Sequence, residues 1–179
     1  MKIPVAGLNF ELLITYDQIQ FRIKELAKQI ESDYRDQTPV LAGILTGSFL
    51  FVADLVKEID MPIEVTFAKL ASYFGGTAST RTIRDDFDLT IDIKGRHLLL
   101  VEDIVDTGNT LHYLVDKLKV REPASITVCT LLLKPGAVEK HIPELKYVGF
   151  EIENEFVVGY GLDYIELGRN LKGIFRKVD

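Results

Sequence analysis

Three acidic side chains lie close together in the middle of the chain, directly ahead of a short polar loop. Residues 97–110 read HLLLVEDIVDTGNT, so that an apolar run leads to Glu102, Asp103 and Asp106, and apolar residues at helical spacing follow over 111–118. This pattern predicts a buried strand, a polar loop and the first turns of a helix. Free backbone N–H groups at the start of a helix bind anions. Acids beside such a site are explained by a ligand that carries both a phosphate and hydroxyl groups.

The elements around this stretch alternate between strands and helices. A capping box of Thr15 and Gln18 predicts a helix that runs to about Tyr34, and Ser48 is expected to cap a helix over 49–59. Apolar or alternating patterns predict strands at residues 8–13, 40–45, 63–68, 82–90, 125–133, 147–151, 156–160 and 174–175. This order predicts an α/β fold with a largely parallel sheet and helices on both faces, in a single domain over residues 1–179.

Polar residues follow several of these strands. Thr46 and Gly47 come after the strand at 40–45, the acids after the next buried strand, Lys134 after 125–133, and Asp163 shortly after 156–160. Ligands of parallel sheets bind at the carboxyl ends of the strands. We therefore expect these side chains to meet at one edge of the sheet.

Composition narrows the classes of function. The chain has 179 residues, 47% of them hydrophobic, and a net charge of −6, which argues against general affinity for nucleic acids. No apolar run approaches the roughly 18 residues that span a bilayer, and no signal sequence is recognised at the N-terminus, so a cytoplasmic location is expected. The one cysteine, Cys129, lies in an apolar run and is expected to be a buried thiol. The spacing of the histidines with Cys129 does not suggest zinc.

The stretch 101–110 resembles the phosphoribosyl pyrophosphate signature of type I phosphoribosyltransferases. Residues 45–48 (LTGS), 72–73 (SY), 134–135 (KP) and 156–164 (FVVGYGLDY) are similar, in order and spacing, to other landmarks of the hypoxanthine(-guanine) phosphoribosyltransferases. The resemblance implies the fold of that family, a twisted parallel sheet flanked by helices, with a small hood built from the N- and C-terminal segments and a flexible hairpin lid over about 72–85. It also implies purine salvage: Mg²⁺-dependent transfer of a phosphoribosyl group from phosphoribosyl pyrophosphate to N9 of hypoxanthine and guanine, by a homodimer or homotetramer.

The resemblance assigns roles within residues 102–110. Glu102 and Asp103 would accept hydrogen bonds from the ribose hydroxyls, directly or through hydrated Mg²⁺. Asp106 would act near purine N7 as general base or proton relay. The 5′-phosphate would be bound by backbone N–H groups and threonine hydroxyls of the loop, which comprises Asp106, Thr107, Gly108, Asn109 and Thr110.

Residues nearer the C-terminus would bind the base and the leaving group. Lys134 would donate to purine O6 and so select 6-oxopurines over adenine, because an amino group offers no acceptor to a buried cation. Phe156 would stack on the base while the Val157 backbone reads its edge. Asp163 would lie beside the purine and bind a Mg²⁺ shared with pyrophosphate, and Arg169 would contact pyrophosphate directly.

Two further segments complete the implied site. Thr46 and Gly47 would present N–H groups to pyrophosphate after a cis peptide bond between Leu45 and Thr46, although many family members carry Lys in place of Thr46. Ser72 and Tyr73 would close over the reacting centre with the loop at 74–81, keeping water from a cation-like transition state. From composition alone, that loop is equally well explained as a surface hairpin without a role.

Two other functions stay open at this point. A xanthine-preferring or broad 6-oxopurine transferase would differ in contacts to the C2 substituent, many of them backbone contacts. A regulatory protein of the same fold that binds RNA or DNA would need a basic face, and neither the net charge nor clusters of Lys and Arg provide one.

Overall fold

A computed structural model describes residues 2–69 and 89–179 of the chain. The predicted lid over about 72–85, with Ser72 and Tyr73, lies outside the described residues. So does the predicted strand at 82–90, apart from Leu89 and Thr90, and these two residues are not in a strand.

A five-stranded parallel sheet forms the centre of the molecule. Its strand order is β4-β3-β5-β6-β7. The bounds are Glu64–Lys69 for β4, Val40–Leu45 for β3, His97–Val105 for β5, Ser125–Leu133 for β6 and Leu145–Glu151 for β7. Every neighbouring pair is parallel. The alternation of strands and helices therefore predicted the α/β class correctly.

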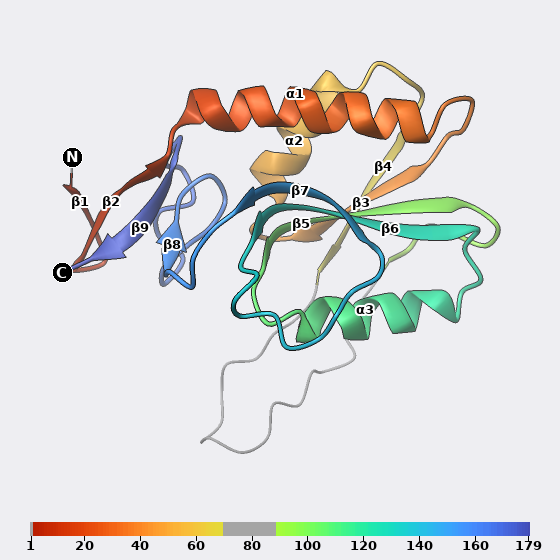
Figure 1. Ribbon diagram of the computed structural model, residues 1–179. Helices are drawn as coiled ribbons and strands as arrows, with labels where there is room; N and C mark the ends of the chain where they lie inside the picture. The colour runs from red at the N-terminus through yellow and green to blue at the C-terminus, as the bar shows by residue number, and fades with distance from the viewer. Residues whose placement is uncertain (1, 70–88) are drawn as a thin grey trace.

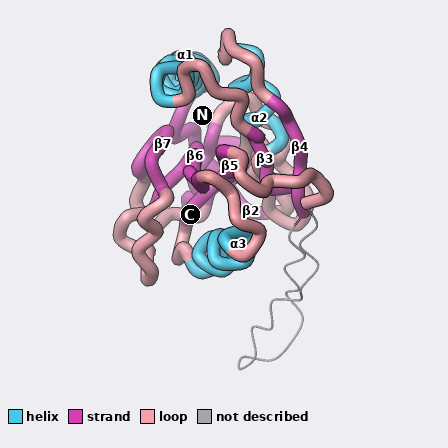
Figure 2. Tube along the Cα trace, turned by 90° about the vertical axis from the view of Figure 1, so that its right-hand side faces the viewer, coloured by secondary structure: helices cyan, strands magenta, loops and turns pink. Residues whose placement is uncertain are grey.

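Within the part of the chain that the structure describes, three helices cover the two faces of this sheet (Figures 1 and 2). Helices α1 (Tyr16–Asp33) and α2 (Phe49–Glu58) pack on one face and α3 (Asn109–Lys119) on the other. Alternate residues of β5 serve the two cores: Leu99 and Val101 pack with α1 and α2, whereas Leu98 and Leu100 pack with α3. These residues are fully buried, which explains why the strand reads as an unbroken apolar run.

The helix starts differ in how their caps are made. Thr15 and Gln18 form the predicted capping box, with Gln18 N donating to Thr15 Oγ1 over 3.2 Å. Ser48 precedes α2 as expected, but its hydroxyl donates to the carbonyl of Ile44 instead of accepting from the helix. The predicted side-chain cap of α2 is therefore wrong, because the buried strand end competes for the same hydroxyl.

A second, antiparallel sheet lies beside the first. Its order is β1-β2-β9-β8, with β1 Lys2–Val5, β2 Leu8–Ile14, β9 Ile174–Val178 and β8 Val157–Val158. We call this sheet the hood. Figure 1 shows β1, β2, β8 and β9 together at one end of the parallel sheet. The apolar run at 156–160 therefore supplies a two-residue strand of the hood. Asp163 was expected to follow a strand of the parallel sheet, and this expectation is wrong because the preceding strand belongs to the hood.

Cys129 is fully buried in β6 with a free thiol, as expected, and burial raises the pKa of that thiol. No helix of the described segments has the length and apolar character needed to cross a membrane.

Candidate active site

The two adjacent acids lie inside β5, because the strand continues to Val105. Neighbouring residues of a strand point to opposite faces of the sheet, so Glu102 and Asp103 diverge. Glu102 faces a cavity of about 270 Å³ on the α3 side. The cavity is lined by Ile44, Leu45, Glu102, Ile104, Val105, Asp106, Thr107, Gly108, Thr110 and Leu111. The cavity thus contains most of the residues expected to bind a phosphoribosyl group.

The loop after β5 presents a helix N-terminus to this cavity. Gly108 has φ +78°, and α3 starts at Asn109 with no side-chain cap among the described residues. A side chain at Gly108 would be strained by that φ and would approach the Lys140 carbonyl to 3.1 Å. Apart from the Asn109 N–H, which donates to Thr107 Oγ1, the backbone N–H groups of the first turn are therefore available to an anion such as phosphate.

Hydrogen bonds to the segment after β6 stabilise the loop. Glu139 N donates to the carbonyl of Thr107 over 3.0 Å, and Asn109 Nδ2 donates to Glu139 Oε2 over 2.7 Å. Thr107 Oγ1 also accepts from Asn109 N over 3.4 Å. Glu139 was not predicted, since it lies 30 residues beyond Asn109 and no motif marks it.

Burial makes the charged forms of both acids costly. Burial raises the pKa of Asp103 to about 6, and the nearby charge of Asp163 adds to the rise. The backbone N–H of Ile104 and the charge of Arg169 act in the opposite direction and lower the pKa. Burial, helped by the charge of Asp103, also raises the pKa of Glu102 well above its ordinary value. A ligand that brings hydroxyl donors or a cation would stabilise the ionised carboxylates.

A buried lysine pairs with the third acid. Lys134 is 7% exposed, and its Nζ lies 3.0 Å from Oδ2 of Asp106. The Lys134 backbone N–H also donates to the carbonyl of Val105 over 3.0 Å. Roles near purine O6 and N7 were predicted separately for these residues, and the structure places them in direct contact at the carboxyl ends of β5 and β6.

The end of β3 packs tightly against Asp103. The peptide bond between Leu45 and Thr46 is cis, as predicted. A Cβ built on Gly47 would lie 1.6 Å from Oδ2 of Asp103, and one built on Gly161 would lie 2.0 Å from the carbonyl oxygen of Gly47. Only glycine fits at both positions, so the predicted pyrophosphate loop, Asp103 and the hood are in close contact.

The hood loop after β8 carries Asp163 and Arg169, which form an ion pair. Arg169 Nη2 lies 2.9 Å from Asp163 Oδ1 and 3.0 Å from Glu166 Oε2, while Nη1 donates to the carbonyl of Gly161 over 2.9 Å. Asp163 Oδ2 accepts from Glu166 N over 2.8 Å. Sequence reasoning missed Gly161 and Glu166; the two glycines of the GYG run at 159–161 were a usable signal for a tight loop.

Phe156 and Val157 lie at the edge of the hood. The Phe156 ring is 45% exposed and meets the Tyr164 ring edge-on, with 5.6 Å between centroids. Val157 belongs to β8, which has a neighbour only on its β9 side within the described sheet. Backbone groups on the other side of β8 are therefore free to read the edge of a base.

The residues present suit a divalent cation bound with its substrate. Within residues 2–69 and 89–179, no group of three His, Cys, Asp or Glu side chains converges as a metal site. Mg²⁺, however, usually binds through one or two carboxylates together with substrate phosphates and water. Asp163 and the partly buried Asp103 offer carboxylates of that kind beside the predicted pyrophosphate loop.

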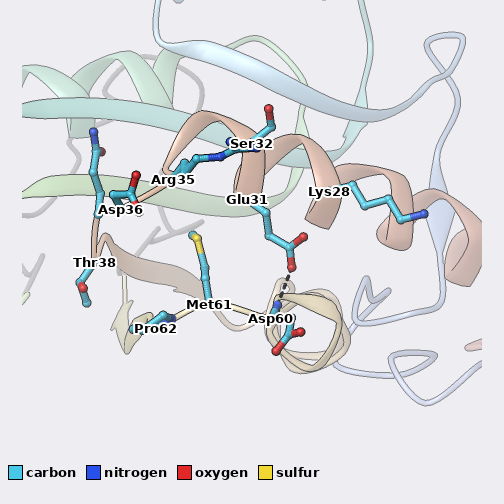
Figure 3. Close-up of a pocket in the computed structure, with 10 residues that line it drawn as sticks. Lys28, Glu31, Ser32, Arg35, Asp36, Thr38, Asp60, Met61 and Pro62 are labelled. Atoms are coloured by element: carbon cyan, nitrogen blue, oxygen red, sulfur yellow. Dashed lines mark hydrogen bonds between the residues drawn. The ribbon is translucent and has the colours of Figure 1, made fainter.

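A larger cavity, of about 770 Å³, lies at the opposite edge of the sheet (Figure 3). It is bordered by the end of α1 and the segments ahead of β3 and β4, and Asp60 N donates to Glu31 Oε1 within it. None of the predicted site residues lines it. The cavity at the end of β5 is therefore the candidate active site despite its smaller size.

Comparison with known proteins agrees with this geometry. A family model for the phosphoribosyl transferase domain matches residues 15–165. The hypoxanthine-guanine phosphoribosyltransferase of Streptococcus pneumoniae is 52% identical over 161 residues, covering 90% of this chain and 89% of the relative. The hypoxanthine phosphoribosyltransferase of Haemophilus influenzae is 47% identical over 166 residues, covering 91% and 92%.

A solved structure is similar over nearly the whole chain. The hypoxanthine phosphoribosyltransferase of Staphylococcus aureus superposes with a TM-score of 0.85 at 42% identity, covering 94% of this chain and 91% of that one. The chain belongs to the phosphoribosyltransferase family.

Proposed function

We propose that this protein is a purine-salvage enzyme that transfers the 5-phosphoribosyl group of phosphoribosyl pyrophosphate to N9 of hypoxanthine or guanine. The products are IMP or GMP and pyrophosphate, with inversion at the anomeric carbon. The observation that carries the proposal is the Lys134–Asp106 pair, 3.0 Å apart, beside an open helix N-terminus. The relatives are named for hypoxanthine, and some also for guanine, which supports the choice of base.

Two kinds of protein group bind the two ends of the phosphoribosyl group. Backbone N–H groups over residues 106–110 bind the 5′-phosphate, and Glu102 and Asp103 accept from the ribose hydroxyls. Phosphate and acids then address opposite ends of one sugar. Because ionised carboxylates only accept hydrogen bonds, they suit the ribose diol and would repel a phosphate.

Lys134 and Asp106 together recognise and deprotonate the base. Lys134 donates to O6, and adenine is rejected because its amino group would leave the buried ammonium without an acceptor. Asp106 accepts the proton released as N9 forms the new bond, by way of N7. Phe156 stacks on the ring and the outer backbone edge of β8 contacts its far side.

Pyrophosphate leaves through the junction of β3 with the hood. Thr46 and Gly47 bind it with backbone N–H groups, and Arg169 supplies a fixed positive charge. When bound there, Mg²⁺ would neutralise charge on the leaving group. Asp163, with Asp103 and Glu102 directly or through water, would hold that ion, and Ser72 and Tyr73 would exclude water from above.

The domain organisation, the location and the oligomeric state of the protein are part of the same proposal. Residues 1–179 form one phosphoribosyltransferase domain with a lid over about 72–85. The enzyme is a cytoplasmic homodimer or homotetramer that binds neither nucleic acid nor membrane. Sedimentation of the purified protein with and without phosphoribosyl pyrophosphate tests the oligomer, and a monomer in both conditions would contradict it.

The decisive assay is Mg²⁺-dependent release of pyrophosphate with single bases. We expect turnover with hypoxanthine and guanine, and none with adenine or uracil; a preference for xanthine would support the broader oxopurine enzyme instead. Asp106→Asn should lower turnover by about 10²–10⁴-fold, the usual contribution of general acid–base catalysis. Lys134→Ala should raise the KM for hypoxanthine.

Lys28→Ala is the matched control for Lys134→Ala. Lys28 lies in the other cavity, at the opposite edge of the sheet, and the change removes the same charge. We expect wild-type kinetics from it. If Asp106→Asn and Lys134→Ala also kept wild-type turnover of hypoxanthine, the assigned roles would be wrong.

A further inference from the structure

Tyr160 connects the hood loop to the helices that cover the parallel sheet. The residue lies between Gly159 and Gly161, two positions after β8, and is 2% exposed. Its hydroxyl donates to Oδ2 of Asp54, in α2, over 2.5 Å. Gln20, in α1, donates through Nε2 to the same carboxylate oxygen over 2.8 Å. Three separate segments therefore share one partly buried carboxylate.

The charge of Asp54 is well stabilised in this cluster. Burial alone would raise the pKa of Asp54, but hydrogen bonds from Lys57, Tyr160 and Gln20 outweigh it and keep the pKa below its ordinary value. Lys57 Nζ lies 2.6 Å from Oδ1, which leaves Oδ2 to Tyr160 and Gln20. The Tyr160 hydroxyl thus donates to an ionised acceptor, and hydrogen bonds of that kind are stronger than neutral ones.

The backbone around Tyr160 is one that needs such an anchor. Gly159, Tyr160 and Gly161 have φ values of +104°, +50° and +101°, all in the left-handed region. Glycine adopts this region freely, but a tyrosine there is strained. The ring and its hydroxyl, fixed against α1 and α2, hold the loop in this shape.

The held loop forms one wall of the predicted pyrophosphate site. Gly161 packs directly on the carbonyl of Gly47, with no room for a Cβ, and its own carbonyl accepts from Arg169 Nη1 over 2.9 Å. A displacement of Tyr160 would therefore reach Gly47 on one side and Arg169 on the other. It would not reach Lys134, which pairs with Asp106 at the ends of β5 and β6.

We infer that Tyr160 and Asp54 are positioning residues for the pyrophosphate half of the active site. Their hydrogen bond sets the Gly159–Gly161 turn, and this turn sets Gly47 and Arg169. Neither residue lines the cavity of the candidate active site. The inference rests on the proposed function, since it assigns those two contacts to pyrophosphate.

Tyr160→Phe tests the inference, because it removes the hydroxyl and keeps the ring. We expect the KM for phosphoribosyl pyrophosphate, and for pyrophosphate in the reverse reaction, to rise about tenfold, the effect of losing about one hydrogen bond. The KM for hypoxanthine should stay within about twofold of wild type. A merely structural role would not separate the two kinds of substrate.

Tyr147→Phe is a closely matched control. Tyr147 is also 2% exposed, and its hydroxyl donates over 2.6 Å to Asp33, which is paired with Lys146 as Asp54 is with Lys57. It lies in β7, on the far edge of the parallel sheet from β3. We expect a comparable loss of thermal stability and no change in any KM.

The outcomes separate this inference from the proposed function. If Tyr160→Phe raised all KM values alike, or behaved as Tyr147→Phe does, the positioning role would be overturned. If Tyr160→Phe did not fold, Asp54→Asn would be judged by the same criteria. If wild type had no transferase activity, the proposed function would fail. Calorimetry of inorganic pyrophosphate with Mg²⁺ would then still test the positioning role. Equal affinity in wild type and variant would overturn the inference, and weaker affinity in the variant would support it.

Discussion

At the scale of single residues, the site holds carboxylates where water cannot fully solvate them. Burial raises the pKa of Asp103 to about 6 in the folded protein, above the value of about 3.9 for an unfolded chain. The folded state therefore binds the proton more tightly, and the ionised carboxylate destabilises it. This loss of stability is absent below about pH 4 and complete above about pH 6.

Asp103→Asn should stabilise the protein at high pH and weaken substrate binding. At about pH 8 we expect the free energy of unfolding to rise by at most about 3 kcal/mol, with no gain at about pH 3.5. Denaturant unfolding at several pH values checks this, and calorimetry should show weaker binding of phosphoribosyl pyrophosphate. Asp116→Asn removes a charge from an exposed position of α3 and should give neither effect. Equal stability of Asp103→Asn and wild type at high pH would contradict the argument.

The sequence singles out individual residues where a motif names them, but not where contacts between distant residues decide. The acids and the loop over 102–110 were proposed from their types and spacing, and their roles stay predictions. Lys134 was assigned to the base only through the resemblance, because a lysine at a strand end is ordinarily a solvent-exposed charge. Its ion pair with Asp106 joins residues 28 positions apart. The contacts of Glu166 and Gly161 form only when the hood packs beside the end of β3. No local pattern encodes such contacts.

At the scale of elements, α1 carries the clearest local signal. Thr15 Oγ1 accepts from Gln18 N, and the Gln18 side chain accepts from Thr15 N over 2.9 Å. Two otherwise unpaired N–H groups of the helix start are thereby satisfied. The buried residues Ile19, Ile23, Leu26 and Ile30 then follow on one face.

Thr15→Ala should lower the free energy of unfolding by about 1 kcal/mol, the usual loss for an N-cap threonine. Ser48→Ala offers a contrast, because the Ser48 hydroxyl donates to a strand carbonyl and makes no cap. Urea unfolding of both variants measures the difference. Full recovery of stability in Thr15→Val, which keeps the shape without the hydroxyl, would show that the cap contributes nothing.

Helices and strands were predictable where either one face or both faces of the element are buried. The apolar runs of β3, β5 and β6 gave strands because both faces of the parallel sheet are covered by helices. β1 was missed and β8 was placed in the wrong sheet, because short strands depend on partners far away in sequence. β8 has two residues, and its partner β9 begins 16 residues after β8 ends. Pairing of this kind is tertiary information.

At the scale of the whole molecule, the candidate site is shared between two sheets. Its predicted residues in the parallel sheet are the acids, the loop over 106–110 and Lys134, whereas those in the hood are Phe156, Val157, Asp163 and Arg169. The sequence predicted the class of fold correctly. It did not predict how the hood meets the parallel sheet, since that depends on the contacts of Tyr160 and of Gly161 with Gly47.

Ligands that contact both sheets should stabilise the molecule more than a ligand of one. Phosphoribosyl pyrophosphate with Mg²⁺, at about 100 times its Kd, should add about 2.7 kcal/mol to the free energy of unfolding. For a chain of this size that corresponds to roughly 5–10 °C in Tm. Thermal scans with phosphoribosyl pyrophosphate and with ribose 5-phosphate, each at the same concentration and with Mg²⁺, test this. Ribose 5-phosphate lacks the pyrophosphate that contacts the hood and should give a smaller shift, and an equal shift from the two ligands would contradict the division of the site.

The strand order of the hood also sets a sequence of events during synthesis. β8 is bonded to β9, and β9 to β2, so β8 has no partner until residues 174–178 have been made. The segments β3, β5 and α3, which form the proposed phosphoribosyl half of the site, leave the ribosome much earlier. The growing chain can therefore form the proposed phosphate-binding loop before the hood is complete. The parts of the proposed site that the hood supplies, for the base and for pyrophosphate, are then the last to be completed in a newly made molecule.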